Sequence, residues 1–171
     1  NRGIALDDLG NYVEALASYD RVLELTPNDS ESWYNRGISL RKLQRYEEAL
    51  ASYEEALKFN VLDASAWYNR GYVLDELKRY QEAIASYDKA LEIEPDDFST
   101  WYNRGLALRQ LNRMEEAIAS FDRAIELQPN KHKAWYNRGL VLRQLGQFSE
   151  AISSLDKAIA LQPSDPCIWY N

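Results

Sequence analysis

The side chains best suited to binding form one recurring pair, Tyr-Asn, which follows every tryptophan of the chain. The tryptophans stand 34 residues apart, so each Tyr and each Asn recurs with the same spacing. Residues at equivalent positions of this pattern are called a column below. The two columns contain Tyr34, Tyr68, Tyr102 and Tyr136 with Asn35, Asn69, Asn103 and Asn137, and they extend to Asn1, Tyr170 and Asn171.

These residue types point to recognition of a peptide. An Asn side chain both donates and accepts hydrogen bonds, so a row of them can hold the amide backbone of an extended peptide. Tyrosine adds a flat amphipathic surface with few rotatable bonds. We predict that both columns bind peptide, with the largest contributions from Asn69, Asn103 and Asn137. The alternative is that both columns satisfy neighbouring helix ends and pack between repeats.

Residues for catalysis or metal binding are sparse. His132 is the only histidine and Cys167 the only cysteine, whereas a structural zinc site needs about four ligands. A nucleophile–base pair lacks its usual base as well, because no second histidine exists. Every glycine falls within a predicted helix or a turn, so no glycine-rich phosphate loop is present. The sequence predicts no enzyme, no metal site and no cofactor, and it places His132 near a helix cap.

The charge balance narrows the class of partner. The formal net charge is −7, which argues against nucleic acid because phosphate backbones select basic surfaces. Apolar runs are too short to cross a membrane, and no targeting signal is visible. The single cysteine cannot form an internal disulfide and favours a reducing compartment, so we expect a cytoplasmic location.

Further columns place the Tyr-Asn pairs on helices. Apolar spacing predicts helices over 30–43 and 46–59, joined by a turn short enough to force antiparallel pairing. Proline closes four repeats, and Val61 takes its place in another. The other strong columns are Gly3, Gly37, Gly71, Gly105 and Gly139; Ala15, Ala49, Ala83, Ala117 and Ala151; and Tyr19, Tyr53, Tyr87, Phe121 and Leu155.

Three columns carry packing predictions. A glycine within a helix is about 1 kcal/mol less favourable than alanine, so we expect the glycine column to touch the alanine column closely. Glutamates in the first turn of each second helix, such as Glu48, should cap that helix. The arginines before each glycine should lie within about 4 Å of carboxylates, unless they extend into solvent. The two columns expected to pair are Arg2, Arg36, Arg70, Arg104 and Arg138 with Asp20, Glu54, Asp88, Asp122 and Asp156.

Taken together, Trp-x-x-x-Gly, then Ala-x-x-x-Tyr/Phe, then Pro, with a period of 34 residues, resembles the tetratricopeptide repeat, in the bacterial form with Trp-Tyr-Asn-Arg-Gly repeats. The resemblance covers the whole chain, although Arg stands where the family usually has Leu before the glycine. It implies an all-α, right-handed superhelical solenoid of antiparallel helix pairs. The repeats would span 1–29 (partial), 30–63, 64–97, 98–131, 132–165 and 166–171 (partial), all within one domain, 1–171.

In the resembled family the first helices line a concave groove, and the function is to bind a protein or an extended peptide. In this chain the groove would be acidic over three repeats and basic over the last two, which favours a ligand with an acidic segment there. A clamp for a chaperone tail needs Lys where this chain has the Tyr column, so we do not expect one. The groove charges are Asp7, Asp8, Glu31, Asp75 and Glu76, then Arg41 and Lys42, then Arg109, Lys133 and Arg143.

Two other functions stay open. The repeats could serve as an accessory or regulatory module of a larger enzyme or signalling protein, or as an element that assembles by stacking on itself. Both ends of the sequence fall within a predicted first helix, which would leave apolar faces uncovered, Ile152 and Leu155 among them. Such faces favour head-to-tail association, whereas flanking repeats or a capping helix in a longer chain would cover them.

Overall fold

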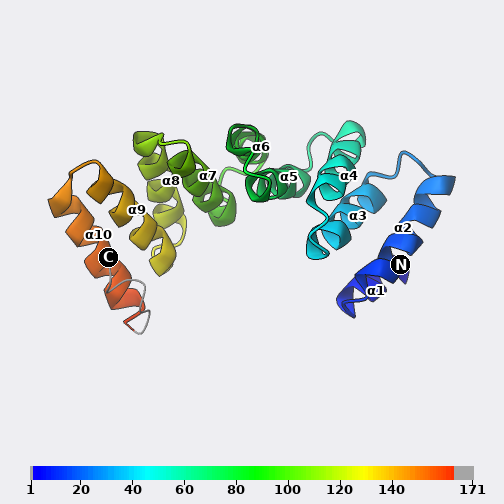
Figure 1. The fold of residues 1–171 in the computed structure, drawn as a ribbon, viewed down its shortest axis with the longest axis horizontal. Coiled ribbons are helices and arrows are strands. Elements are labelled where there is room, and N and C mark those ends of the chain that lie inside the picture. The colour runs from blue at the N-terminus through cyan, green and yellow to red at the C-terminus, as the bar shows by residue number, and fades with distance from the viewer. Residues whose placement is uncertain (1, 164–171) are drawn as a thin grey trace. The chain divides into compact units, whose positions relative to one another are not determined.

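The chain, described here over residues 2–163 by a computed structural model, is an all-α helical repeat solenoid. Its described residues form ten helices and no strand, and the helices follow one another in pairs (Figure 1). The predicted helices over 30–43 and 46–59 are confirmed as α3 and α4. The helices are α1 (Arg2–Asp8), α2 (Tyr12–Leu25), α3 (Ser30–Lys42), α4 (Tyr46–Phe59), α5 (Ala64–Glu76), α6 (Tyr80–Ile93), α7 (Phe98–Gln110), α8 (Met114–Leu127), α9 (His132–Gln144) and α10 (Phe148–Leu161).

The chain divides into two compact units, residues 1–93 and residues 94–171, called the N-terminal and the C-terminal unit. Within the N-terminal unit the helix pairs are α1–α2, α3–α4 and α5–α6, and α2–α3 and α4–α5 join successive repeats. Within the C-terminal unit the pairs are α7–α8 and α9–α10, and α8 packs against α9. First helices of successive repeats also touch, α3 with α5 and α7 with α9. Inside each unit, repeats therefore contact their sequence neighbours, as expected for a solenoid.

The turns inside the helix pairs end each first helix sharply. Gly10 and Gly146 adopt φ values of 77° and 74°, and Gln44 adopts 60° at the equivalent position. The next backbone N–H then bonds a carbonyl of the last helical turn, as from Arg45 to Leu40 at 2.9 Å. This geometry satisfies carbonyls that a helix end leaves without a partner, and it reverses the chain direction.

The glycine column makes room for side chains of the second helix, and the alanine column comes as near only at Gly139, where an added Cβ would also lie 3.2 Å from the backbone oxygen of Ala151. A Cβ added at Gly37 would lie 2.6 Å from Cε1 of Tyr53, and one at Gly71 would lie 2.6 Å from Cε1 of Tyr87. Both tyrosines are fully buried. The ring lies directly against the first-helix backbone, so the aromatic column is the reason that glycine is needed.

The arginine column joins successive repeats. Nε of Arg36 donates to Asp20 at 2.8 Å, and its Nη1 donates to Ser52 Oγ at 2.7 Å. The acid lies on the second helix of the preceding repeat, and the serine lies on the second helix of the arginine's own repeat. The predicted ion pairs are confirmed at three positions: Arg36–Asp20, Arg70–Glu54 and Arg138–Asp122.

The tryptophans fix the turns between repeats. The indole N–H of Trp33 donates to the backbone carbonyl of Pro27 at 2.8 Å, and that of Trp67 donates to Val61 at 2.8 Å. Because the acceptor is a backbone oxygen, valine can replace proline without loss of the bond. The Arg36 guanidinium lies over the Trp33 ring, 5.7 Å from its centroid, so the two columns also contact each other.

The glutamate column does not cap the second helices as predicted. Glu48 instead accepts from Nε and Nη2 of Arg45, at 2.7 and 2.6 Å, and this hydrogen bonding lowers the pKa of Glu48. No side-chain hydrogen bond caps α4. Side-chain caps occur on first helices, where Asp63 accepts from the backbone N–H of Ala66 at 2.9 Å.

Candidate functional site

Within the described residues, the tyrosines of the Tyr-Asn pairs lie half-buried on the first helices, and the rings of Tyr34, Tyr68 and Tyr102 pack against aromatic rings of the second helices. The ring centroids of Tyr34 and Tyr53 are 6.0 Å apart, and those of Tyr68 and Tyr87 are 6.1 Å apart. Both contacts are tilted, a geometry that aromatic pairs favour. One side of each of these rings is therefore fixed by the core, and part of the ring surface stays accessible.

Asparagines of the following repeat hold the tyrosine hydroxyls. Nδ2 of Asn69 donates to Tyr34 Oη at 3.2 Å and to the backbone carbonyl of Ser65 at 2.9 Å. Only 8% of the Asn69 surface is exposed. The bond ties α3 to α5, so the hydroxyl of Tyr34 has a fixed position.

The same arrangement recurs in the C-terminal unit with an arginine added. Nδ2 of Asn137 donates to Tyr102 Oη at 3.1 Å and to the carbonyl of Lys133 at 2.9 Å. Nη1 of Arg109 donates to Asn137 Oδ1 at 2.6 Å. Burial raises the pKa of Tyr102, so its hydroxyl stays protonated. Three first-helix side chains thus form one hydrogen-bonded frame.

Three of the predicted binding residues, Asn69, Asn137 and Arg109, make side-chain hydrogen bonds within the chain. The amide donors of Asn69 and Asn137 are engaged within the chain, as the packing alternative predicts, and Arg109 is engaged with Asn137. The remaining predicted residues keep accessible surface. Asn35, Asn103, Tyr68 and Tyr136 are half-buried, and Lys133 and Arg143 are exposed. Peptide binding by these columns stays a prediction.

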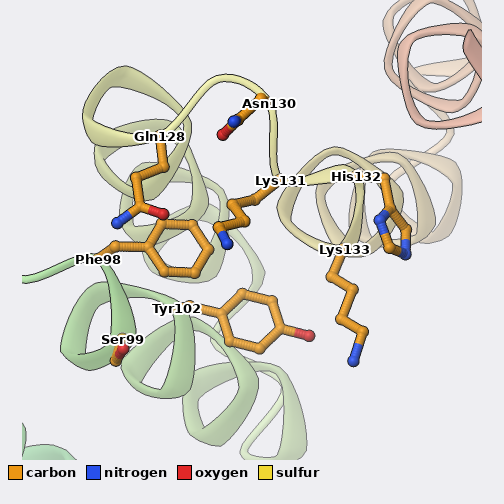
Figure 2. Close-up of a pocket in the computed structure, with 8 residues that line it drawn as sticks. All are labelled: Phe98, Ser99, Tyr102, Gln128, Asn130, Lys131, His132 and Lys133. Atoms are coloured by element: carbon orange, nitrogen blue, oxygen red, sulfur yellow. The ribbon is translucent and has the colours of Figure 1, made fainter. Parts of the chain in front are cut away.

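A cavity of about 650 Å³ lies beside the Tyr102 frame in the C-terminal unit. Phe98 and Tyr102, one helical turn apart on α7, stack with centroids 5.8 Å apart and an interplanar angle of 8°. Figure 2 shows the two rings on one side, with Lys131 extending toward Phe98 and Lys133 lying beyond the hydroxyl end of Tyr102. The lining residues are Phe98, Ser99, Tyr102, Gln128, Asn130, Lys131, His132 and Lys133.

Sequence reasoning missed most of this cavity, although a signal was present. Phe98 stands in a column with Ser30 and Ala64, and Lys131 stands in the column of the helix-start aspartates, such as Asp63. Both residues depart from their columns at the same place in the structure. His132, predicted to be exposed near a cap, is the half-buried first residue of α9 and lines the cavity.

The first helices of the N-terminal unit carry acidic side chains, in contrast to the basic side chains beside Tyr102. Asp7 accepts from Tyr19 Oη at 2.7 Å and from Ser39 Oγ at 2.6 Å. Asp75 occupies the same column but is half-buried without such bonds, and burial, with the Glu76 charge beside it, raises the pKa of Asp75 to about 6. The two carboxylates therefore have the same position and different surroundings.

Among residues 2–163, no group of three or more His, Cys, Asp or Glu side chains is arranged to hold a metal ion. Every helix in the same range is too short or too polar to span a bilayer.

The helix pairs and their connecting columns define a helical repeat protein of the tetratricopeptide class. The sequence profile described as Tetratricopeptide repeat matches residues 1–60, 34–98, 90–132 and 102–166. Those matches span nearly the whole sequence, so the chain belongs to the tetratricopeptide repeat family, whose members are typically protein-interaction modules.

Solved structures agree with this assignment. MamA superposes with a TM-score of 0.93 at 21% identity over 95% of each chain, a likeness of fold alone. YrrB, described as a TPR protein with an unusual peptide-binding site, gives a TM-score of 0.91 at 27% identity, over 98% of this chain and 87% of that one. A MamA fragment from Desulfovibrio magneticus RS-1 gives 0.91 at 25% identity, over 97% and 94%. No curated protein sequence matches significantly.

Proposed function

We propose that the chain is a binding scaffold that takes an extended peptide, or an extended segment of a protein, on the surfaces of its first helices. The observation that carries this proposal is the Tyr–Asn frame, which occurs in both units, as Tyr34–Asn69 and as Tyr102–Asn137. Such a frame holds aromatic surface in place before a ligand arrives, which lowers the entropic cost of binding. The similarity to YrrB, a peptide-binding protein by its description, supports the same function.

The charges suggest the polarity of the ligand. Lys133 and Arg143 are exposed in the C-terminal unit, so an acidic segment of the ligand would lie there. The acidic balance of the whole chain argues against nucleic acid as the partner. In this proposal the chain performs no catalysis, and residues 1–171 serve as one binding domain.

The test is to locate bound peptide on the chain. Peptides would be selected from a random library on the immobilised protein, and a photoreactive residue would be placed at Ser65 or Ser99, both exposed on first helices. The matched controls are Ala51 and Ala119, exposed on second helices. Cross-linking of selected peptides from the first-helix positions supports the proposal. Cross-linking mainly from the controls contradicts it.

Self-association is a second candidate, and one feature favours it. On α10, Phe148 and Ile152 are 63% and 60% exposed. Apolar surface of this kind suits a second copy of the chain. Sedimentation over a range of concentrations would test this. A mass that rises with concentration, and that Ile152→Glu returns to the monomer value, supports association, and a constant monomer mass contradicts it.

The hypothesis that the repeats are an accessory module of a larger protein predicts the same peptide-binding site. A peptide bound to the first helices would have the same contacts whether or not a catalytic domain accompanied the repeats. The two readings separate only in the sequence of the complete protein.

A further inference from the structure

The cavity beside Tyr102 combines an aromatic wall with positive charge, and the starts of the first helices in the N-terminal unit, α3 and α5, have neither an equivalent aromatic residue nor an equivalent lysine. In the N-terminal unit, Tyr34 and Asn69 form the same frame, but the residue equivalent to Phe98 is Ser30 and the residue equivalent to Lys131 is Asp63. The frame is thus common to both units. The side chains around it are what differ.

The aromatic wall is held in position. Tyr102 stacks on Phe98, lies tilted against Phe121 with centroids 6.0 Å apart, and accepts a hydrogen bond from Asn137. Phe98 and Tyr102 also pack against the buried cluster of Ala124, Ile125 and Ala134. A flat side chain placed on this wall would meet a surface that needs no rearrangement.

The basic side of the cavity carries uncompensated charge. Lys131 and Lys133 are exposed, and the described residues give neither ammonium group an ion pair or a hydrogen bond. No carboxylate is among the lining residues. In Figure 2 the Lys131 side chain extends toward the Phe98 ring and the Lys133 side chain extends past the hydroxyl end of Tyr102, whereas His132 points away from both rings.

We propose that this cavity, formed by α7 and the start of α9, binds an acidic peptide segment in which an aromatic residue adjoins a carboxylate. The aromatic side chain lies on the Phe98–Tyr102 wall, and the carboxylate lies between the two lysine ammonium groups. The inference rests on the proposed peptide-binding function and adds a location and a ligand class. Charge complementarity favours this ligand, because the two lysine ammonium groups that line the cavity are positive and the wall is apolar.

The probe is a short fluorescent peptide containing Phe-Glu-Glu, with two matched peptides that replace Glu by Gln or Phe by Ala. Anisotropy titration should give the Phe-Glu-Glu peptide an affinity about tenfold above either matched peptide, the size expected for losing one charge-assisted or one aromatic contact. Added salt should weaken only the binding that depends on Glu.

The decisive variant is Lys131→Asp with Lys133→Ser, which installs the residues found at the equivalent positions Asp63 and Ser65. Both lysines are exposed, and Asp at position 131 would take the N-cap place on α9 that Asp63 has on α5, so the melting temperature should not fall. The same charge change made at Lys58 and Lys89, two exposed lysines on second helices, is the control. Affinity should fall at least about tenfold in the first variant and stay within about twofold in the control. Phe98→Leu, which keeps apolar packing but removes the stack, should lower affinity for the Phe peptide only.

Three results would overturn the proposal: no binding of Phe-Glu-Glu by the unaltered chain, equal loss in the control variant, or no loss in either. Library-selected peptides that still cross-link from Ser65, which does not line the cavity, would then show that the scaffold function stands without this cavity. If selected peptides cross-link only from second-helix positions, the scaffold proposal itself fails. The two failures are therefore distinguishable.

Discussion

At the residue scale, the column of Asp7 and Asp75 shows that the same residue at equivalent backbone positions can have different hydrogen-bond partners. Asp7 has two hydrogen-bond donors, Tyr19 and Ser39. Asp75 has neither kind of bond among the described residues, and the hydroxyl of Tyr87, equivalent to that of Tyr19, is buried without a partner. The aspartate with donors contributes to stability, whereas the desolvated one opposes folding when it is charged.

We therefore predict that Asp75→Asn stabilises the protein at pH 7. The pKa of Asp75 is raised from 3.8 to about 6 in the folded state, so the folded chain binds a proton more tightly than the unfolded chain between these values. The charged carboxyl group is unfavourable above about pH 6, and the penalty disappears as the pH falls toward 4. After allowance for solvent screening, the gain at pH 7 should be on the order of 1 kcal/mol.

Urea unfolding at several pH values measures this gain as the difference between the variant and the unaltered protein. The difference should shrink between pH 6 and pH 4. Asp7→Asn, in the same column, is the control and should destabilise instead, because an amide cannot accept both hydrogen bonds as a carboxylate does. A gain from Asp75→Asn that is equal at pH 4 and pH 7 would contradict the argument.

At the element scale, the arginine column connects three helices at repeat boundaries inside each unit. Arg70 lies on α5, its acid Glu54 on α4 and its serine Ser86 on α6. Its side chain is 18% exposed, whereas Glu54 is 45% exposed, so the contact is partly screened. Loss of the Arg70 side chain should affect Ser86 more than Glu54, because Ser86 is buried and water cannot replace the lost hydrogen-bond donor.

Replacing Arg70 with Met keeps the aliphatic stem and removes both polar contacts. We expect a loss of about 1 kcal/mol in the free energy of unfolding, from one hydrogen bond to a charged group and one partly exposed ion pair. Lys89→Met is the control, because its ion pair with Glu92 lies on the surface of α6 alone. Chemical unfolding should show a clearly smaller loss in the free energy of unfolding for Lys89→Met. Equal losses would mean that contacts between helices contribute no more to stability than an ion pair within one helix.

The helices and turns were largely predictable because the same residue pattern recurs in each repeat. Helix bounds, turns and the pairing of arginine with acid all followed from the 34-residue spacing. The contact of glycine with Tyr53 did not, because spacing along the chain does not say which second-helix side chain crosses the glycine. The capping role of Glu48 was wrong for a local reason, since Arg45 competes for its carboxylate.

The candidate site was less predictable. Columns reveal what repeats share, but the cavity depends on Phe98 and Lys131, which depart from their columns. The burial of Asn69 and Asn137 also could not be inferred, because it requires the tyrosine of the preceding repeat to lie within hydrogen-bond distance. Shared residues form the frame, whereas the unshared residues Phe98 and Lys131 determine the surface beside it.

At the scale of the whole molecule, stability should be distributed along the chain. In repeat proteins it is approximately a sum of terms within repeats and between neighbours, and contacts in each unit follow that rule. A change in one repeat should therefore weaken that repeat and its neighbours before it weakens the rest. Such a chain need not unfold in a single step.

Gly37→Ala provides the test. The added Cβ would lie 2.6 Å from a ring carbon of Tyr53, which is fully buried and cannot move aside, so overpacking of about 1–3 kcal/mol should outweigh the gain in helix propensity. Hydrogen exchange should quicken about tenfold or more in α3 and α4, and less in α2 and α5, while α9 and α10 keep their protection. Gly105→Ala, which would meet Phe121 at 2.7 Å, should instead affect α7 and α8 most and spare α1 and α2. If either variant speeds exchange equally in all helices, the chain unfolds as one cooperative body and the nearest-neighbour description fails.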